Sequence, residues 1–180
     1  MRTTLLVIYT PDLEACNDFY TGFGLPMVRE QHGAGPVHYA AEFEDGFVFE
    51  VYPATSKEPT GRARLGFSVP AGPLPSGTHR LTDPDGRIVI VTAEPTAAEA
   101  EARKAATDLF GADAVVTFTA HGGGAESIDI TLGGGRSIVI DHSGEEWGVS
   151  VDPADAEGMT GHDDVTGSLD EALRLAHAKL

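Results

Sequence analysis

The chain has 180 residues, of which 41% are hydrophobic, so it can bury one medium core or two small ones and is not expected to be disordered. Its 28 acidic residues outnumber 12 lysines and arginines, and the resulting net charge of −16 disfavours nucleic acids and anionic membranes as partners. The single cysteine, Cys16, excludes an internal disulfide, and no apolar run approaches the roughly 18 residues of a membrane span, so the composition favours a cytoplasmic protein.

Residues 5–52 carry the pattern of a β-α-β-β-β unit. The apolar run at 5–9 predicts a strand, and Thr10 followed by Pro11 predicts the N-cap and first position of a helix that ends near Gly22. Three further strands are expected at 27–31, 38–43 and 47–52. The Asp-Gly step at 45–46 predicts a tight hairpin between the last two of them.

Residues 53–94 predict a second, shortened unit. A polar linker at 53–61 precedes strands expected at 64–69, 79–82 and 87–92, and a turn at 83–86 joins the last two strands. The stretch at 70–77 contains too many prolines and glycines to form a helix.

The composition changes near residue 94, where we expect a domain boundary. An alanine-rich helix is predicted at 96–110, followed by strands near 114–120, 127–132, 137–141 and 147–151 with glycine triplets as turns. A closing helix at 168–180 begins with Ser168 as its cap and Glu171 in the capping-box position, and the acidic run at 159–164 is expected to be a solvated loop. Residues 95–180 therefore predict a small α-β-β-β-β-α domain of unknown function.

Residues 1–94 contain an ordered set of short motifs. The opening strand is followed by Asp12-Leu13, Phe19-Tyr20 and Gly24-Leu25, and later by the strand Phe49-Glu50-Val51-Tyr52. Leu65-Gly66-Phe67 and the turn at 83–86 come after these. In this order the motifs resemble the glyoxalase/bleomycin resistance/dioxygenase superfamily, also named the vicinal oxygen chelate superfamily, with residues 49–52 as the last strand of one module and the later motifs as parts of a second module. The resemblance implies an α+β fold of βαβββ modules, whose sheets cup a ligand, in a homodimer.

The resemblance also implies metal ligands on the first and last strands of each module, and this chain keeps only Glu50 among them. The other positions correspond to Leu5, Arg64 and Ile90. One carboxylate cannot hold a divalent ion beside two hydrocarbon side chains and a cation. We therefore expect no metal at this position and no cofactor, with Glu50 contacting a ligand, pairing with Arg64 or facing solvent at an open face of the sheet.

Strand alternation and the family's cupped sheet predict the ligand-binding face. The expected lining residues are Leu5, Val7, Tyr9, His38, Val48, Glu50, Tyr52 and Arg64. The glycine-rich turn at 33–35 lies between two histidines, which leaves two further interpretations of this segment: a relocated metal site formed by His32, His38 and Glu50, or a turn capped by one histidine.

The expected function is metal-independent binding of a small organic ligand, of the bleomycin-resistance type and thus related to antibiotic resistance. The negative charge suits a cationic ligand, and sequestration requires only a cavity with a few polar anchors. One alternative is a metal-dependent lyase, isomerase or dioxygenase that uses the relocated site. Another is a protein-interaction scaffold acting through residues 95–180. The sequence identifies no catalytic residue.

Overall fold

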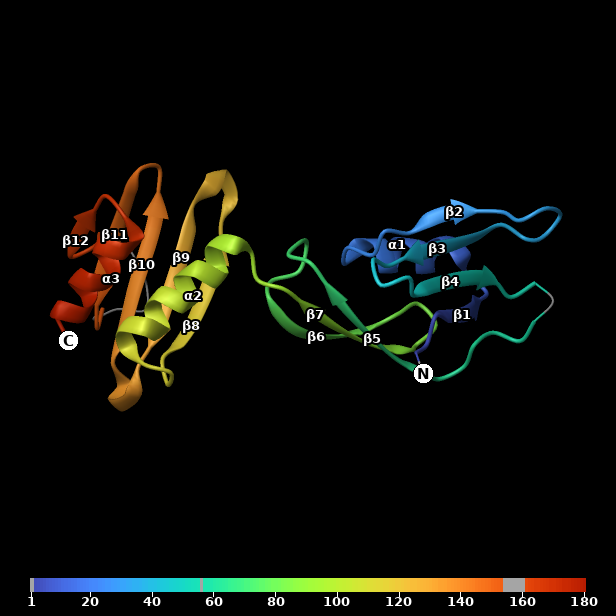
Figure 1. Ribbon diagram of the computed structural model, residues 1–180, viewed down its shortest axis with the longest axis horizontal. Helices are drawn as coiled ribbons and strands as arrows, with labels where there is room; N and C mark the ends of the chain where they lie inside the picture. Colours follow the sequence, from blue (N-terminus) through green and yellow to red (C-terminus); the bar gives the residue numbers. More distant parts are fainter. Residues whose placement is uncertain (1, 56, 154–160) are drawn as a thin grey trace. The chain divides into compact units, whose positions relative to one another are not determined.

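The protein is described from a computed structural model that covers residues 2–55, 57–153 and 161–180 (Figure 1). The chain divides into two compact units, Met1–Thr96 and Ala97–Leu180. Separate sets of buried residues form a hydrophobic core in each unit. The division falls two residues beyond the expected boundary at residue 94.

The first unit opens with the predicted βαβββ order, which confirms the α+β fold. Its elements are β1 (Leu5–Thr10), α1 (Leu13–Gly22), β2 (Val28–Glu30), β3 (His38–Glu42) and β4 (Val48–Pro53). They form a sheet of order β1-β4-β3-β2, in which β1 is parallel to β4 and the other pairs are antiparallel. Gly46, at a φ of +77°, supplies the left-handed backbone that the predicted hairpin turn needs.

The N-terminus of α1 differs from the sequence prediction. Asp12, not Thr10, caps the helix, because its carboxylate accepts a hydrogen bond from the Ala15 backbone amide at 3.0 Å. Thr10 stays in β1, where it pairs with Pro53 of β4, and its hydroxyl accepts from the Asp12 amide at 3.1 Å. Because β1 extends one residue further than predicted and includes Thr10, the helix begins later. Asp12 becomes its N-cap, and Pro11 lies just before the cap instead of after it.

The second part of this unit is the predicted shortened module, and no helix forms between its first two strands at residues 70–76, all of which are described. β5 (Arg64–Val69), β6 (Gly77–Thr82) and β7 (Ile88–Ala93) form a sheet of order β5-β7-β6 with β5 parallel to β7. The apolar face of this sheet packs into the same core as α1 and β4. Phe67, for example, lies with its ring centroid 5.2 Å from that of Phe49 and 6.1 Å from that of Tyr20. The aromatic residues of α1 and β4 thus cover the sheet that has no helix of its own.

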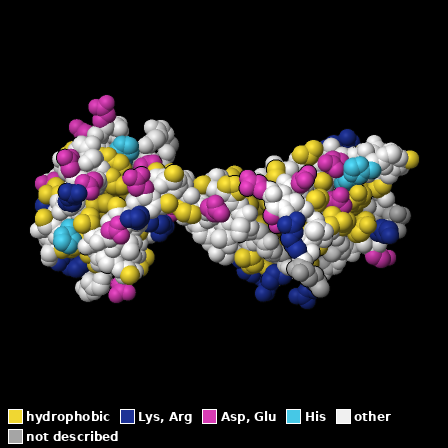
Figure 2. Space-filling model, in the orientation of Figure 1, with side chains coloured by type: hydrophobic (Ala, Val, Ile, Leu, Met, Phe, Trp, Pro, Cys, Tyr) yellow, Lys and Arg dark blue, Asp and Glu magenta, His cyan; other side chains and the backbone are white. Residues whose placement is uncertain are grey.

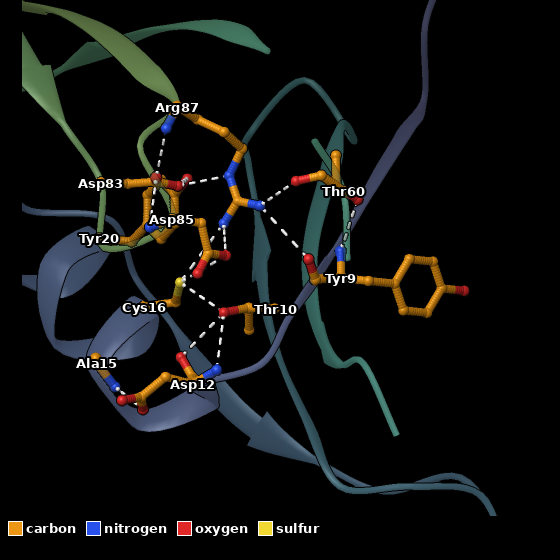
Figure 3. Close-up of polar contacts among 10 residues, drawn as sticks. All are labelled: Tyr9, Thr10, Asp12, Ala15, Cys16, Tyr20, Thr60, Asp83, Asp85 and Arg87. Atoms are coloured by element: carbon orange, nitrogen blue, oxygen red, sulfur yellow. Dashed lines mark hydrogen bonds and ion pairs between the residues drawn. The ribbon is translucent and has the colours of Figure 1, made fainter. Parts of the chain in front are cut away.

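A buried polar network also joins the second module to α1 and β1 (Figure 3). The side chain of Arg87 is fully buried, and its Nε and Nη2 atoms donate to carboxylate oxygens of Asp83 at 2.6 Å and Asp85 at 2.5 Å. Its Nη1 donates to the Thr60 carbonyl at 3.0 Å, and the Tyr20 hydroxyl donates to Asp83 at 2.9 Å. The turn at 83–87 therefore supplies the charged contacts that attach the second sheet.

Burial changes the acid–base behaviour of two groups in this network. It raises the pKa of the Tyr20 hydroxyl far above its ordinary value, and the negative charge of Asp83 adds to the effect. Burial likewise raises the pKa of the Cys16 thiol, which lies beside Thr10. Cys16 is a buried, protonated thiol that packs in the core of α1.

The second unit is an antiparallel sheet with two helices on one face. Its elements are α2 (Ala97–Phe110), β8 (Val115–Ala120), η1 (Gly122–Gly124), β9 (Glu126–Thr131), η2 (Gly133–Gly135), β10 (Ser137–Ser143), β11 (Glu146–Val151), β12 (Asp164–Thr166) and α3 (Leu169–Ala178). The strand order is β12-β11-β10-β9-β8, and alternate residues such as Ile128, Ile130 and Ile140 are buried against α2 and α3. No helix among the described residues combines the length and the apolar character that crossing a membrane requires.

Two details of the second unit correct the sequence prediction. A fifth strand, β12, pairs with β11, where only four strands were expected. Ser168 caps α3 as predicted, but the Glu171 carboxylate accepts from the Gly167 amide at 3.3 Å, one residue before the amide that a capping box would use. Of the loop expected at 159–164, Met159 and Thr160 lie outside the described residues, and Asp164 begins β12.

Candidate functional site

In the first sheet, one face is covered by α1, and we name the other face, which no helix among the described residues of this unit covers, the open face. Ile8, Phe49 and Val51 point into the core that contains α1. Because side chains alternate along a strand, their neighbours point the other way. The register of β1 with β4 pairs Val7 with Glu50 and Tyr9 with Tyr52, so Glu50 lies on the open face, as the alternation predicted.

Three aromatic or heteroaromatic rings form a row across the open face. The Tyr52 ring stacks on the His38 ring at a centroid distance of 4.1 Å and an interplanar angle of 8°, and the Tyr9 ring lies 6.0 Å away on its other side. His38 is only 1% exposed, whereas both tyrosines are partly exposed. Burial raises the pKa of the Tyr52 hydroxyl, and the charge of Glu50 raises it further, so the hydroxyl is protonated at neutral pH and can donate a hydrogen bond.

Two carboxylates lie near the His38 end of this row of rings. An oxygen of Glu50 lies 4.0 Å from His38 Nε2, and an oxygen of Glu30 lies 3.7 Å from the same nitrogen and 3.3 Å from His32 Nε2. The Glu50 side chain is 18% exposed. Within the described residues, no lysine or arginine pairs with Glu50 or Glu30, and the histidine nitrogens are the basic atoms near their carboxylates.

The ion pair expected between Glu50 and Arg64 does not form in the described structure. Glu50 points away from the core shared by the two sheets, and so does Arg64, because its neighbour Leu65 points into that core. Side chains on the outer faces of two sheets that share one core point away from each other. Arg64 is therefore exposed on the second sheet and lies apart from the other predicted ligand-binding residues.

The remaining predicted residues lie together on β1, β3 and β4 of the open face. Leu5 pairs with Val48 at the end of the β1–β4 ladder, and Leu5 is 51% exposed because β1 is an edge strand. Glu30 was not among the predicted site residues, although it pairs with His38 across the β2–β3 hairpin. A hairpin centred on the turn at 33–35 places Glu30 opposite His38, so the position of the turn could have suggested this pairing. The histidine pair thus lies closest to Glu30, and Glu50 is a more distant neighbour.

A separate cavity of about 730 Å³ lies elsewhere in the first unit. It is lined by residues 24–26, 42–45, 47 and 66–70 together with Glu94, and it contains none of the predicted ligand-binding residues. Phe67 forms part of its wall, and Glu42, Glu44 and Asp45 contribute carboxylates. Acidic side chains are spread over the visible surface of each unit (Figure 2), so charge alone does not distinguish this cavity from the open face.

No protein-family model and no curated protein matches the chain. Among solved structures, the chain is similar to a possible glyoxalase from Bacillus cereus, at 15% identity over 51% of this chain and 98% of that chain, with a TM-score of 0.36. It is also similar to a structure from the mobile metagenome of V. Pseudocholerae, at 18% identity over 53% of this chain and 96% of that chain, with a TM-score of 0.39. A lactoylglutathione lyase from Agrobacterium tumefaciens is 15% identical over 78% of this chain and 92% of that chain, with a TM-score of 0.28.

Proposed function

We propose that the open face binds a small organic ligand carrying a basic or hydrogen-bond-donating group, in the manner of bleomycin-resistance proteins. The observation that carries this proposal is the row formed by Tyr9, Tyr52 and His38 with the carboxylate of Glu50 beside it. No lysine or arginine forms an ion pair with Glu50 in the described structure. A partly buried carboxylate beside aromatic rings suits a ligand that brings its own positive charge or donor.

The side chains of the open face can supply both parts of such a binding site. The rings of Tyr9 and Tyr52 offer apolar contact, and their faces attract cations. Glu50 can accept a charge-assisted hydrogen bond, which is stronger than a bond between neutral groups. The overall charge of −16 would raise the local concentration of a cationic ligand.

The proposed binding does not use a metal at the positions of the resembled family. Leu5 and Ile90 stand at two of these positions and offer no ligand atom, and Arg64 offers a cation. Glu50 alone cannot complete a coordination shell there. The proposal therefore assigns Glu50 to the organic ligand.

A homodimer is part of this proposal. Both edge strands of the first sheet, β1 and β2, expose a large apolar residue, with Leu5 51% and Val28 57% exposed. A second copy of the chain that covered these edges would enclose the open face and remove water from a bound ligand. Sedimentation analysis tests this part: a dimer that dissociates in Leu5→Glu would support it, and a monomer at all concentrations would contradict it.

A ligand screen followed by calorimetry tests the binding site. Thermal-shift screening against cationic antibiotics and host metabolites should find a stabilising ligand, and Glu50→Gln should weaken its binding by about 1.5–3 kcal/mol, the usual contribution of a hydrogen bond to a charged group. Glu101→Gln, on the exposed side of α2, serves as the matched control.

The same measurements can contradict the proposed location of the ligand-binding site. A tight ligand whose affinity is unchanged in both Glu50→Gln and Tyr9→Ala does not bind at the open face. If its affinity falls instead in Glu44→Gln, the ligand occupies the separate cavity.

A further inference from the structure

We propose that Glu30, His32 and His38 bind a divalent first-row transition metal ion, such as zinc, at the edge of the open face. The three side chains come from β2, the turn after it, and β3, and their ligand atoms all lie within 4.8 Å of one another. None of these residues stands at a metal position of the resembled family. The site goes beyond the proposed function, which needs no metal.

The distances between the ligand atoms already resemble those of a metal site. Ligand atoms held roughly 2.0–2.1 Å from a zinc ion at tetrahedral angles lie about 3.3–3.4 Å from each other. The shared oxygen of Glu30 lies 3.3 Å from His32 Nε2 and 3.7 Å from His38 Nε2. The third distance, between the ligand nitrogens of His32 and His38, is at most 4.8 Å. A small rotation of the exposed His32 side chain would shorten it, so the metal could bind without a change in the backbone.

The environment of His38 prepares its Nε2 atom for a metal. Nδ1 lies 3.3 Å from the Pro36 carbonyl, and donation to that oxygen places the lone pair on Nε2. The Tyr52 hydroxyl is 3.2 Å from Nε2, but the two rings are stacked at 8°, so the hydroxyl lies over the ring face. The lone pair, which lies in the plane of the imidazole ring, remains available.

The groups around this lone pair are negative. Carboxylate oxygens of Glu30 and Glu50 lie 3.7 and 4.0 Å from Nε2, beyond good hydrogen-bond distance. An imidazole lone pair that faces two carboxylates in a buried position is stabilised by a cation placed between them. A metal ion supplies this charge and binds all three ligand types directly, since imidazole and carboxylate are both common zinc ligands.

The turn between the two histidines is held in place by its own hydrogen bonds. The Gly35 amide donates to the His32 carbonyl at 3.0 Å, and the Gln31 side chain donates to the Gly35 carbonyl at 2.9 Å. These bonds fix the backbone of His32 relative to β3, so less conformational freedom is lost when a metal binds.

Zinc titration of the untagged full-length protein tests the site in the absence of any organic ligand. Calorimetry should show one zinc ion per chain, and cobalt in its place should give the strong visible absorption of a tetrahedral complex. Glu30→Gln and His32→Asn should each weaken zinc binding by at least about tenfold. Substitution of a residue that only hydrogen-bonds to a metal ligand already lowers metal affinity by about this factor, and loss of a ligand should lower it at least as much. His79→Asn, a histidine of β6 whose ring contacts the Pro75 carbonyl, is the matched control.

Two results would overturn the proposal: no stoichiometric zinc binding, or stoichiometric binding that neither Glu30→Gln nor His32→Asn weakens. His32 is largely exposed, so its substitution tests the site without disturbing the core. Failure of the organic-ligand screen would not affect either result, because the titration contains the metal alone.

Discussion

Arg87 shows what a single residue contributes that the sequence pattern does not reveal. The motif at 83–87 predicts a turn, and the structure contains that turn, with Asp83 Oδ1 accepting from the Arg87 amide at 2.8 Å. The pattern does not indicate that the Arg87 side chain is buried, because arginine usually stays at the surface. The guanidinium donates to the Thr60 carbonyl, and its partner Asp83 accepts from the Tyr20 hydroxyl; both contacts join residues distant in sequence and could not be predicted without the fold.

Arg87→Met should destabilise the first unit by about 3–5 kcal/mol, because it leaves the buried carboxylate of Asp83 without its cation. Urea unfolding followed by the fluorescence or circular dichroism of the first unit measures this change. Arg80→Met, an exposed arginine of the neighbouring strand β6, should change stability by less than about 0.5 kcal/mol. Equal effects of the two substitutions would show that the buried network does not stabilise the fold.

The raised pKa of Tyr20 predicts sensitivity to alkaline pH. The folded state keeps the phenol proton at pH values where the unfolded chain, with an ordinary tyrosine pKa near 10, has lost it. The stabilisation is therefore complete below about pH 10 and declines as the pH rises above that value. Unfolding free energies measured between about pH 8 and pH 11 should fall more steeply for the wild type than for Tyr20→Phe. Identical slopes would refute this assignment.

At the scale of elements, the order of strands and helices could be predicted from the sequence, but several ends and one strand could not. Apolar periodicity and the Asp-Gly turn located β1, α1, β3 and β4. The cap of α1 depends on how far β1 pairs with β4, which is a tertiary property. The three-residue strand β12 has too little pattern to detect, and it exists because β11 offers it an edge.

Asp12→Ala should destabilise the first unit by about 1 kcal/mol, a typical effect of removing a helix cap. Asp18→Ala, in the body of α1, provides the control for the loss of one negative charge on the same helix. Denaturant midpoints of the two variants give the comparison. If Asp18→Ala were as destabilising as Asp12→Ala, the loss would reflect charge and not capping.

Part of the candidate site could be predicted from the alternation of side chains along each strand. Alternation placed Tyr9, Glu50 and Tyr52 on one face, and the register of β1 with β4 brings them together. Arg64 was assigned to this face by the resemblance, but the second sheet packs on the core from its other side. The neighbourhood of Glu30 depends on the β2–β3 register, which alternation within a single strand does not determine.

At the scale of the whole molecule, the two cores predict two units that fold separately. The buried residues of Met1–Thr96 and of Ala97–Leu180 form distinct clusters, each built from both sheet and helix. A fragment of residues 1–96 should therefore be soluble and should unfold cooperatively, with a denaturant midpoint close to that of the same unit in the full chain. An insoluble or unfolded fragment would show that the first unit needs residues 97–180 to cover one of its sheet edges.

The central claim is that the open face of the first sheet binds an organic ligand, and mapping of amide chemical shifts tests it most directly. Isotope-labelled full-length protein would be titrated with the tightest ligand from the screen, and the shifts of every assigned amide would be followed. If the ligand binds there, saturable changes should be concentrated on β1, β3 and β4 around Tyr9, His38, Glu50 and Tyr52. Changes confined to residues 42–45, 47 and 66–70 around the separate cavity, or to the second unit, would contradict the claim.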